Sequence, residues 1–415
     1  MSPSQSTELN DWLAKLELLD PSHIELGLDR TKAVLARLNL PAEAKIIMVA
    51  GTNGKGSTVA VLDKLLSTQG KTVGAYTSPH ILHFHERIRI RGKFASSAEL
   101  VLAFEAIEAV REDTPLTYFE FATLAAAYLF SNSDLDFWLM EVGLGGRLDA
   151  VNVFDADVSI VTNIGLDHQQ WLGNTLEEIG AEKAAIYRTD KPAIFGAIDR
   201  PLTIDQSVIS LASNGKFAGR DFGLNDRGEW WHGNLDTGLI LPVDCNIAPE
   251  NLSAAIAALA EIGHVPSQSQ VDELEFFTLP GRHHRFNYVG TQILADVAHN
   301  EDSARCLAQK LDELPNADWI AVIGAMGDKS LEALIGPMLD KVSEWVLVRP
   351  CIDRAASIQS LEHALTSAGV SKNRIQACPD IQLLPSIFRG REAAVIYGSF
   401  YTIGECFSVM GVEIV

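Results

Sequence analysis

The sequence lacks the features that mark several classes of protein. Its five cysteines include no C-x-x-C pair, and no apolar run approaches the ~18 residues that cross a bilayer. Basic residues are outnumbered by acidic ones, which gives a formal net charge of −21. Nucleic acids and anionic membranes bind cationic surfaces, which this composition disfavours. These absences argue against a disulfide scaffold, a zinc ribbon, a membrane span, and a nucleic-acid or membrane partner.

What is present is the composition of an ordinary globular protein. Hydrophobic residues make up 47% and charged residues 21% of the 415 residues, a length that suggests two or three domains. The N-terminal residues lack the basic start and apolar run of a signal peptide, so we expect a cytoplasmic protein. In such a reducing compartment we expect buried free thiols at Cys245, Cys306, Cys351, Cys378 and Cys406.

Apolar runs alternate with helical periodicity, which predicts a wound parallel sheet. Strands are expected at residues 45–50, 72–78, 136–143 and 157–165, and helices at 58–69, 97–113, 117–132 and 249–263. Residues 215–242 mix turn residues with Phe and Trp and predict hairpins, whereas residues 276–286 predict a hinge. After it the alternation restarts. We therefore expect an α/β fold in two domains. The N-terminal one (1–282) is a P-loop-type ATPase domain with a mostly parallel wound sheet, and the C-terminal one (283–415) is Rossmann-like.

The stretch "VAGTNGKGS" (49–57) is a shortened phosphate-binding loop. The usual pattern is Gly, four residues, then Gly-Lys-Ser/Thr, but here only two residues separate Gly51 from Gly54. The loop lies between an expected strand and an expected helix, where backbone N–H groups and the helix dipole favour a phosphate. A plain turn is the weaker alternative. The predicted nucleotide contacts are Thr52, Asn53, Gly54, Lys55, Gly56 and Ser57.

Three more polar residues stand at the ends of expected strands, on the same sheet edge as the glycine loop: Ser78, Glu141 and His168. Mg²⁺ prefers oxygen ligands and often uses one or two carboxylates beside substrate phosphates. These residues are therefore candidate magnesium ligands. The alternatives to metal binding are a salt bridge for Glu141 and an ordinary hydrogen-bonded histidine for His168.

Nine blocks along nearly the whole chain resemble, in order, those of the folylpolyglutamate synthases and dihydrofolate synthases, relatives of the Mur peptide ligases. The blocks are "HIELGLDR" (23–30), "YTSPHILHFHERIRI" (76–90), "LTYFEFATLAA" (116–126), "EVGLGGRLDAVN" (141–152), "TNIGLDHQQWLG" (162–173), "IGAEKAAIYR" (179–188), "LPGRHHRF" (279–286), "DVAHN" (296–300) and "YGSFYTIGE" (397–405). In that family the shortened glycine spacing is normal, so the resemblance implies an ATP-dependent ligase.

The resemblance also implies ligands and roles for single residues. Ser78 and Glu141 match ligands of a first magnesium, and His168 matches a further magnesium ligand. Lys183 matches a carbamoylated lysine that helps to place a second magnesium, although a solvated surface lysine is the alternative. K⁺ is a further candidate cofactor. Asn251, Arg282 and Asp296 match ATP contacts, and His299 and Ser399 match positions near the incoming glutamate. Lys55, Lys183 and His299 are the expected catalytic residues.

Three blocks resemble the dihydropteroate site of the bifunctional bacterial enzymes. Their residues are His23, Ile24, Glu25, Leu26, Thr117, Tyr118, Phe119, Glu120, Leu148, Asp149 and Ala150. Tyr118, Phe119 and Phe121 suit a flat heterocycle, or are simply helix core. Glu120 and Asp149 are expected to hydrogen-bond the pterin N–H groups.

The resemblance predicts ATP-dependent ligation of L-glutamate to dihydropteroate and then to tetrahydrofolates, through an acyl phosphate. The alternatives are a single-function synthase of either kind, a Mur-type peptide ligase, or a nucleotide switch. Only 50 residues precede Gly51, which is too few for the nucleotide-sugar domain of a Mur peptide ligase. We expect small-molecule substrates and a monomer.

Overall fold

The computed structural model describes residues 6–18, 27–41, 43–233, 235–242, 245–315 and 318–414. The chain forms two compact units, one ending at Phe277 and the other running on from Thr278. Each unit is α/β, which confirms the fold class predicted from the sequence. The functional domains expected at residues 1–282 and 283–415 stay a prediction.

The first unit is built on an eight-stranded sheet in the order β4-β3-β2-β5-β1-β6-β7-β8. The strands are β1 (Lys45–Ala50), β2 (Val73–Tyr76), β3 (Ile88–Ile90), β4 (Lys93–Phe94), β5 (Phe137–Glu141), β6 (Val158–Val161), β7 (Pro192–Phe195) and β8 (Asn214–Phe217). In the order of the sheet, the pairings from β2 to β8 are parallel, and the pairings of β3 with β2 and of β4 with β3, at one edge, are antiparallel. The carboxyl ends of β2, β5, β1 and β6 therefore lie side by side.

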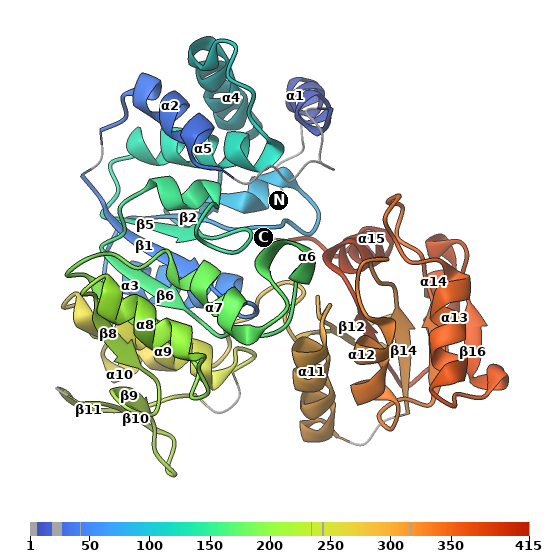
Figure 1. The fold of residues 1–415 in the computed structure, drawn as a ribbon. Helices are drawn as coiled ribbons and strands as arrows, with labels where there is room; N and C mark the ends of the chain where they lie inside the picture. The colour runs from blue at the N-terminus through green and yellow to red at the C-terminus, as the bar shows by residue number, and fades with distance from the viewer. Residues whose placement is uncertain are drawn as a thin grey trace. The chain divides into compact units, whose positions relative to one another are not determined.

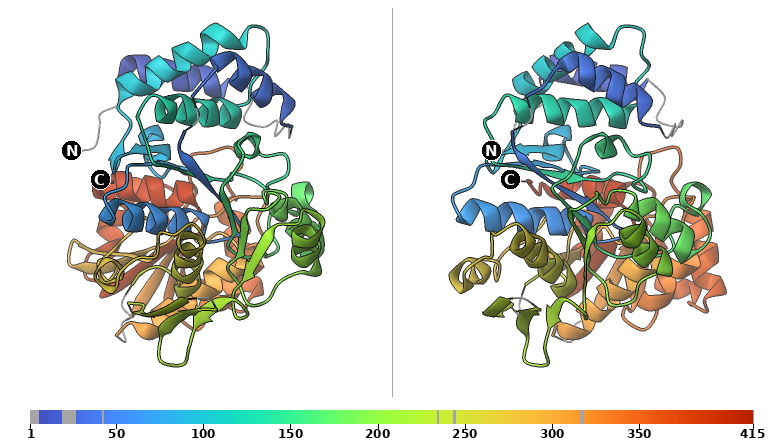
Figure 2. Two further views of the ribbon diagram at one scale, coloured as in Figure 1. Left: turned by 90° about the vertical axis from the view of Figure 1, so that its left-hand side faces the viewer. Right: turned by 60° about the vertical axis from the view of Figure 1, so that its left-hand side comes forward.

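Helices cover both faces of this sheet (Figures 1 and 2). One face carries α5 (Tyr118–Ser131), with α1 (Thr7–Glu17), α2 (Asp29–Leu38) and α4 (Ser97–Arg111) outside it. The other face carries α3 (Lys55–Thr68) and α9 (Pro249–Glu261). The remaining helical elements are η1 (Phe84–Arg87), η2 (Ala150–Val153), α6 (Gln169–Leu172), α7 (Leu176–Ala184), α8 (Leu202–Ser210) and α10 (Gln268–Asp272).

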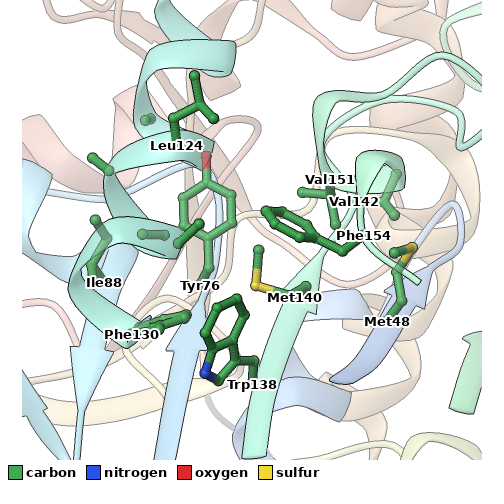
Figure 3. Packing of buried hydrophobic residues seen from close by; sticks show 14 of the residues in the cluster. Met48, Tyr76, Ile88, Leu124, Phe130, Trp138, Met140, Val142, Val151 and Phe154 are labelled. Carbon is green, nitrogen blue, oxygen red and sulfur yellow. The ribbon is translucent and has the colours of Figure 1, made fainter. Parts of the chain in front are cut away.

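The core between α5 and the sheet is apolar and aromatic (Figure 3). Trp138 and Met140 project from alternate positions of β5, as the two-residue period of a strand requires, and both are buried. The Trp138 ring centroid lies 5.7 Å from that of Phe130 on α5 and 6.1 Å from that of Phe154. This packing fixes the strands whose ends carry the polar residues predicted to bind ligands.

The prediction of hairpins over residues 215–242 is partly wrong. Residues 214–217 form β8, which pairs in parallel with β7 and so extends the main sheet. Only the rest forms an antiparallel three-stranded sheet, from β9 (Phe222–Leu224), β10 (Glu229–His232) and β11 (Leu235–Ile240). The turn-rich composition indicated the antiparallel strands, but it gave no signal that the first strand of this region, β8, pairs with the main sheet.

The small sheet rests on α9 through polar contacts. The Trp230 indole N–H donates to Ser253 Oγ at 3.0 Å. His232 Nε2 lies 3.0 Å from Glu261 Oε1, and Lys216 Nζ lies 3.1 Å from the same oxygen. Ser253 and Glu261 thus hold α9 to the small sheet, whereas Lys216 joins Glu261 to β8 of the main sheet.

The second unit has a six-stranded sheet in the order β12-β13-β17-β14-β15-β16. The strands are β12 (His284–Tyr288), β13 (Thr291–Ala295), β14 (Trp319–Ile323), β15 (Glu344–Leu347), β16 (Ile375–Ala377) and β17 (Ala393–Tyr397). All pair in parallel except β12, which is an antiparallel edge strand. The helical elements are α11 (Glu301–Glu313), α12 (Leu331–Ile335), η3 (Gly336–Met338), α13 (Ile358–Ser367), η4 (Lys372–Arg374), η5 (Ile381–Leu383), α14 (Leu384–Phe388) and α15 (Phe400–Met410).

All five cysteines are free thiols, as predicted, but the expectation that all are buried is wrong. Cys306 and Cys351 are exposed. Cys306 lies on amphipathic α11 beside the stripe of buried residues, and Cys351 lies in the loop after β15. No helix within the described residues combines the length and the apolar character that a membrane crossing requires.

Candidate active site

The glycine loop is shaped by close approach of other side chains. Gly51 and Gly54 have positive φ values of 148° and 83°. A Cβ atom on Gly51 would lie 1.8 Å from Thr162 Oγ1, and one on Gly54 would lie 2.4 Å from Asn251 Oδ1. Both positions therefore require glycine, for space as well as for backbone conformation. The conformation of the loop is thus fixed by its neighbours, and it brings Asn251, a predicted nucleotide contact, beside Gly54.

Residues that follow β6 brace the loop from the other side. The Asn53 N–H donates to Asn163 Oδ1 at 3.0 Å, and the Thr162 hydroxyl donates to the Asn53 carbonyl at 2.6 Å. The Thr52 hydroxyl donates to the Gly165 carbonyl at 3.2 Å and accepts from the Gly165 N–H at 2.9 Å. This role of Thr162, Asn163 and Gly165 could not be predicted, because the motif gives no sign of which neighbouring strand supplies the brace.

Lys55 begins α3 and folds back over the loop. Its Nζ donates to the carbonyls of Gly51 at 3.0 Å and Thr52 at 3.2 Å. Gly56 and Ser57 follow in the first helical turn, and Ser57 is buried. A Cβ on Gly56 would lie 3.5 Å from Glu141 Oε2, so the Glu141 carboxylate lies against this turn.

The structure brings two of the three predicted magnesium ligands together. Glu141 is the last residue of β5 and is only 3% exposed. Its Oε2 accepts the Ser78 N–H at 3.0 Å. His168 is exposed and lies in a separate turn at the start of α6, with Nε2 3.9 Å from Asp167 Oδ2.

Protein side chains alone do not complete a metal cage here. Within the described part of the chain, no group of three or more His, Cys, Asp or Glu side chains could hold an ion. A buried carboxylate beside a phosphate-type loop nevertheless fits Mg²⁺, which takes the rest of its oxygen shell from water and substrate phosphates. The donor set suits magnesium bound together with a nucleotide.

Lys183 lies in the last turn of α7 and is buried, so the surface-lysine alternative is wrong. Burial and, to a smaller extent, the positive charge of Lys55 together lower the pKa of its amine from 10.5 to about 7. Asp167 and Asp149 oppose this shift of the pKa. The loop at Gly146 packs on the same turn, since a Cβ there would lie 3.0 Å from the Lys183 carbonyl oxygen. Lys183 is thus a partly neutral amine near the cation of the glycine loop.

Asp149 is buried between the carboxyl end of β5 and η2. Burial raises the pKa of its carboxyl group to about 6, although backbone N–H groups and the charge of Lys55 act against the rise. Its two oxygens accept the N–H groups of Leu144 at 2.8 Å and Val151 at 3.0 Å. The neighbours Leu148 and Ala150 are half-buried and buried. The carboxylate expected at the pterin therefore also holds its own loop in shape.

Thr117 and Glu120 form a capping box at the start of α5. Glu120 Oε2 accepts the Thr117 N–H at 2.7 Å, and the Thr117 hydroxyl accepts the Glu120 N–H at 3.2 Å. Glu120 Oε1 accepts from Arg30 Nη2 at 3.1 Å and from the Thr31 hydroxyl at 3.2 Å. The T-x-x-E spacing could have revealed the cap in the sequence, but the 90-residue separation of Arg30 and Glu120 hid their ion pair.

The predicted aromatic wall is only partly available. Phe121 is fully buried, so the helix-core alternative holds for this residue. Tyr118 and Phe119 are half-buried. The Phe119 ring centroid lies 5.9 Å from that of Tyr76, and the Arg87 guanidinium lies 5.3 Å from the Tyr118 ring centroid. The remaining pterin-block residues, His23, Ile24, Glu25 and Leu26, lie outside the described residues.

In the second unit, the carboxylate of Asp296 binds the backbone next to Arg282 and next to His299, which are both predicted to contact substrates. Its Oδ2 accepts the His283 N–H and its Oδ1 accepts the Ala298 N–H, both at 2.8 Å. Arg282 and His299 directly flank these two residues in the chain. Asp296 was expected to contact ATP, and in the structure both of its carboxylate oxygens accept backbone N–H groups.

The other side chains of this cluster gather at the start of α15. The Arg282 guanidinium lies over the Phe400 ring, 4.9 Å from its centroid. The His299 Nδ1–H donates to the Val297 carbonyl at 3.0 Å. Ser399 caps α15, because its hydroxyl oxygen accepts the Thr402 N–H at 3.0 Å. Phe400 was missed in the sequence, where nothing distinguishes it from a core aromatic.

Two family models match the chain. The Mur ligase middle domain matches residues 49–237, and the Mur ligase glutamate ligase domain matches residues 281–391. The Escherichia coli (strain K12) dihydrofolate synthase/folylpolyglutamate synthase is 35% identical, over 99% of this chain and 97% of that protein. The Haemophilus influenzae protein of the same name is 32% identical over 99% of both chains.

Solved structures show the same likeness over whole chains. The E. coli FolC protein in complex with DHPP and ADP has a TM-score of 0.90 and 34% identity, over 99% of both chains. The bifunctional folylpolyglutamate synthase/dihydrofolate synthase of Yersinia pestis, complexed with AMPPNP and Mn ion, has a TM-score of 0.89 and 36% identity, over 99% of this chain and 100% of that one. A further structure of an enzyme of that name, with Mn, AMPPNP and L-glutamate bound, has the same scores and coverage.

Proposed function

Because the chain belongs to the dihydrofolate synthase/folylpolyglutamate synthase family of Mur-type ligases, we propose that it joins L-glutamate to dihydropteroate and adds γ-linked glutamates to tetrahydrofolates, using ATP. The observation that carries the proposal is the conformation of the glycine loop. Its two constrained glycines, its folded-back Lys55 and the buried carboxylate of Glu141 suit a nucleotide and a metal ion together.

The chemistry activates a carboxylate. A carboxylate is a poor electrophile, because oxide would be its leaving group. One of its oxygens attacks the γ-phosphorus of ATP, which forms an acyl phosphate and releases ADP. The glutamate amine, after losing a proton, attacks the acyl carbon. The C–O bond to phosphate breaks, and the amide and inorganic phosphate are the products. Lys55 stabilises the charge on the transferring phosphoryl group.

Ser78 and Glu141 would hold the first of two magnesium ions, and His168 a second. Bound magnesium would neutralise charge on the nucleotide phosphates. K⁺ is a further candidate ion. The observations that support the first site are the burial of Glu141 and its contact with the loop that carries Ser78.

Lys183 is proposed to carry a carbamate that helps to place the second magnesium. The ammonium group first loses one proton, and the neutral amine then attacks CO₂. A C–N bond forms as one C=O π bond opens, and a second proton leaves the nitrogen, so that a cation becomes an anion. Its burial and its pKa of about 7 support this step, because only the neutral amine reacts with CO₂.

The remaining roles follow the family resemblance. Asn251, Arg282 and Asp296 are assigned to the nucleotide, and His299 and Ser399 to glutamate. The pterin would lie at Tyr118, Phe119 and Asp149 together with the other residues of the three pterin blocks. A cytoplasmic monomer with domains 1–282 and 283–415 completes the proposal.

A product assay by mass tests the proposal. Dihydropteroate, glutamate and Mg-ATP should yield one product, larger by one glutamyl unit, with one ADP released per product. Tetrahydrofolate should yield a ladder of glutamyl units. A product from dihydropteroate but no ladder from tetrahydrofolate would mean that the enzyme is only a dihydrofolate synthase. A ladder from tetrahydrofolate but no product from dihydropteroate would mean that it is only a folylpolyglutamate synthase. ADP release that needs neither acceptor would favour a nucleotide switch and overturn the proposal.

A further inference from the structure

The ring of Phe400 contacts two side chains that have separate assignments. The guanidinium carbon of Arg282 lies 4.9 Å from the ring centroid, and the His299 ring centroid lies 6.3 Å away at an interplanar angle of 50°. Arg282 is assigned to the nucleotide and His299 to glutamate. We propose that Phe400 is a positioning residue that holds both side chains and thereby couples the binding of ATP and glutamate. This inference rests on the proposed function.

Phe400 is held rigidly at the first position of α15. The Ser399 hydroxyl oxygen accepts the Thr402 N–H at 3.0 Å, and the two hydroxyl oxygens lie 2.8 Å apart. The Thr402 hydroxyl donates to the Gly324 carbonyl at 2.7 Å. Ser399 and Thr402 are 3% and 0% exposed. The backbone at Phe400 therefore cannot shift without breaking buried hydrogen bonds, each of which is costly to lose.

The backbone of Arg282 is also fixed, and only its long side chain is left to be placed. Gly281 and His283, on either side, have φ values of 66° and 41°. The Gly281 carbonyl accepts the Val297 N–H at 2.9 Å, and the His283 N–H donates to Asp296 Oδ2 at 2.8 Å. An arginine side chain has several rotatable bonds, so a ring beneath its guanidinium narrows its conformations.

His299 is oriented by a backbone carbonyl as well as by the ring. A carbonyl can only accept, so the 3.0 Å contact from Nδ1 to Val297 O places the proton on Nδ1. Nε2 is then the acceptor in the neutral imidazole. The carboxylate of Asp296 fixes the two backbone segments, and the ring of Phe400 fixes the two side chains.

The coupling predicts a specific kinetic pattern for Phe400→Leu, which keeps an apolar side chain but removes the aromatic face. Cation–π contacts in partly buried settings correspond to a loss of about 3- to 10-fold in affinity. We expect the KM values for ATP and for glutamate to rise together by about this factor. The KM for dihydropteroate and the melting temperature should stay unchanged, because neither depends on the Phe400 face.

The neighbouring residue offers a matched control. Tyr401 is 42% exposed, and Arg354 lies over its ring at 5.7 Å, but neither has a predicted role in the reaction. Tyr401→Leu thus removes a comparable arginine–aromatic contact one position away and should leave all three KM values unchanged. Phe400→Tyr keeps the aromatic face and should retain KM values within about twofold of wild type.

Steady-state kinetics on the full-length wild type and the three variants, with ADP and product mass as readouts, test the inference. A parallel rise of the KM for ATP and glutamate in Phe400→Leu alone supports it. Unchanged KM values in Phe400→Leu, an equal rise for all three substrates, or the same effect in Tyr401→Leu would overturn it while leaving the ligase function intact. A wild-type enzyme that forms no glutamyl product would instead overturn the proposed function, and this inference with it.

Discussion

The pKa of Lys183 leads to a quantitative prediction about carbamate formation. With a pKa of about 7, the neutral amine is about 10% of the population at pH 6, about half at pH 7 and about 90% at pH 8. A lysine with the ordinary value of 10.5 is about 0.03% neutral at pH 7, so burial and the Lys55 charge together raise the reactive fraction by roughly a thousandfold.

The assay is ¹³C NMR of the protein in ¹³C-bicarbonate, with the carbamate resonance followed from pH 6 to pH 8. The resonance should grow as pH rises through about 7, because the folded-state pKa is depressed and the neutral form is gained above it. Lys55→Met should move this transition to higher pH, since it removes a positive charge that lowers the pKa of Lys183. The lowered pKa also makes folding stability depend on pH. Between pH 10.5 and about 7, Lys183 is protonated in the unfolded chain but neutral in the folded chain, so the unfolded state is favoured as pH falls through this range.

The control is Lys191→Arg, because Lys191 is a half-exposed lysine paired with Asp157 at 2.9 Å. This variant should keep the resonance, whereas Lys183→Arg should lose it. Absence of any resonance at pH 8 in saturating bicarbonate, or a resonance that survives Lys183→Arg, would refute the reasoning.

Three further changes probe the site. Glu141→Gln keeps the shape of the side chain but removes its charge, so kcat/KM should fall by roughly 100-fold and the Mg²⁺ titration should shift to higher concentrations; an unchanged Mg²⁺ dependence would count against the metal assignment. Gly54→Ala forces a positive φ and a clash with Asn251. It should weaken AMPPNP binding in calorimetry by about 1–3 kcal/mol, and wild-type affinity would show that the loop does not hold the nucleotide. Glu120→Gln weakens the pair with Arg30 and should lower the free energy of unfolding by about 2 kcal/mol, seen as a lower melting temperature. A raised KM for dihydropteroate at an unchanged melting temperature would instead mean that Glu120 serves only the pterin.

Much of the first unit's architecture was readable because its signals are local. Apolar runs gave β1, β2, β5 and β6, and their parallel order brings Ser78 and Glu141 to one edge next to the glycine loop. The helix after the loop starts at Lys55, three residues earlier than its apolar period indicates, because the glycine-rich turn itself is the first helical turn.

Other features depend on partners far along the chain and could not be read locally. The bracing of Asn53 by Asn163 and the pairing of Glu120 with Arg30 are set by tertiary neighbours. The burial of Lys183 did have a usable signal, since Lys183 follows Ile179 by four residues and so shares its buried helical face.

Helix α9 has a consequence for engineering this protein. In its first turn Asn251 fills the space above Gly54, and two residues further Ser253 accepts the Trp230 indole N–H. Its last residue, Glu261, lies 3.0 Å from His232 Nε2 of the small antiparallel sheet. This one helix therefore links the small antiparallel sheet to the phosphate loop. A foreign domain inserted into that sheet would displace α9 and so disturb the loop, and we expect insertions to be tolerated only where the hydrogen bond between Trp230 and Ser253 is kept.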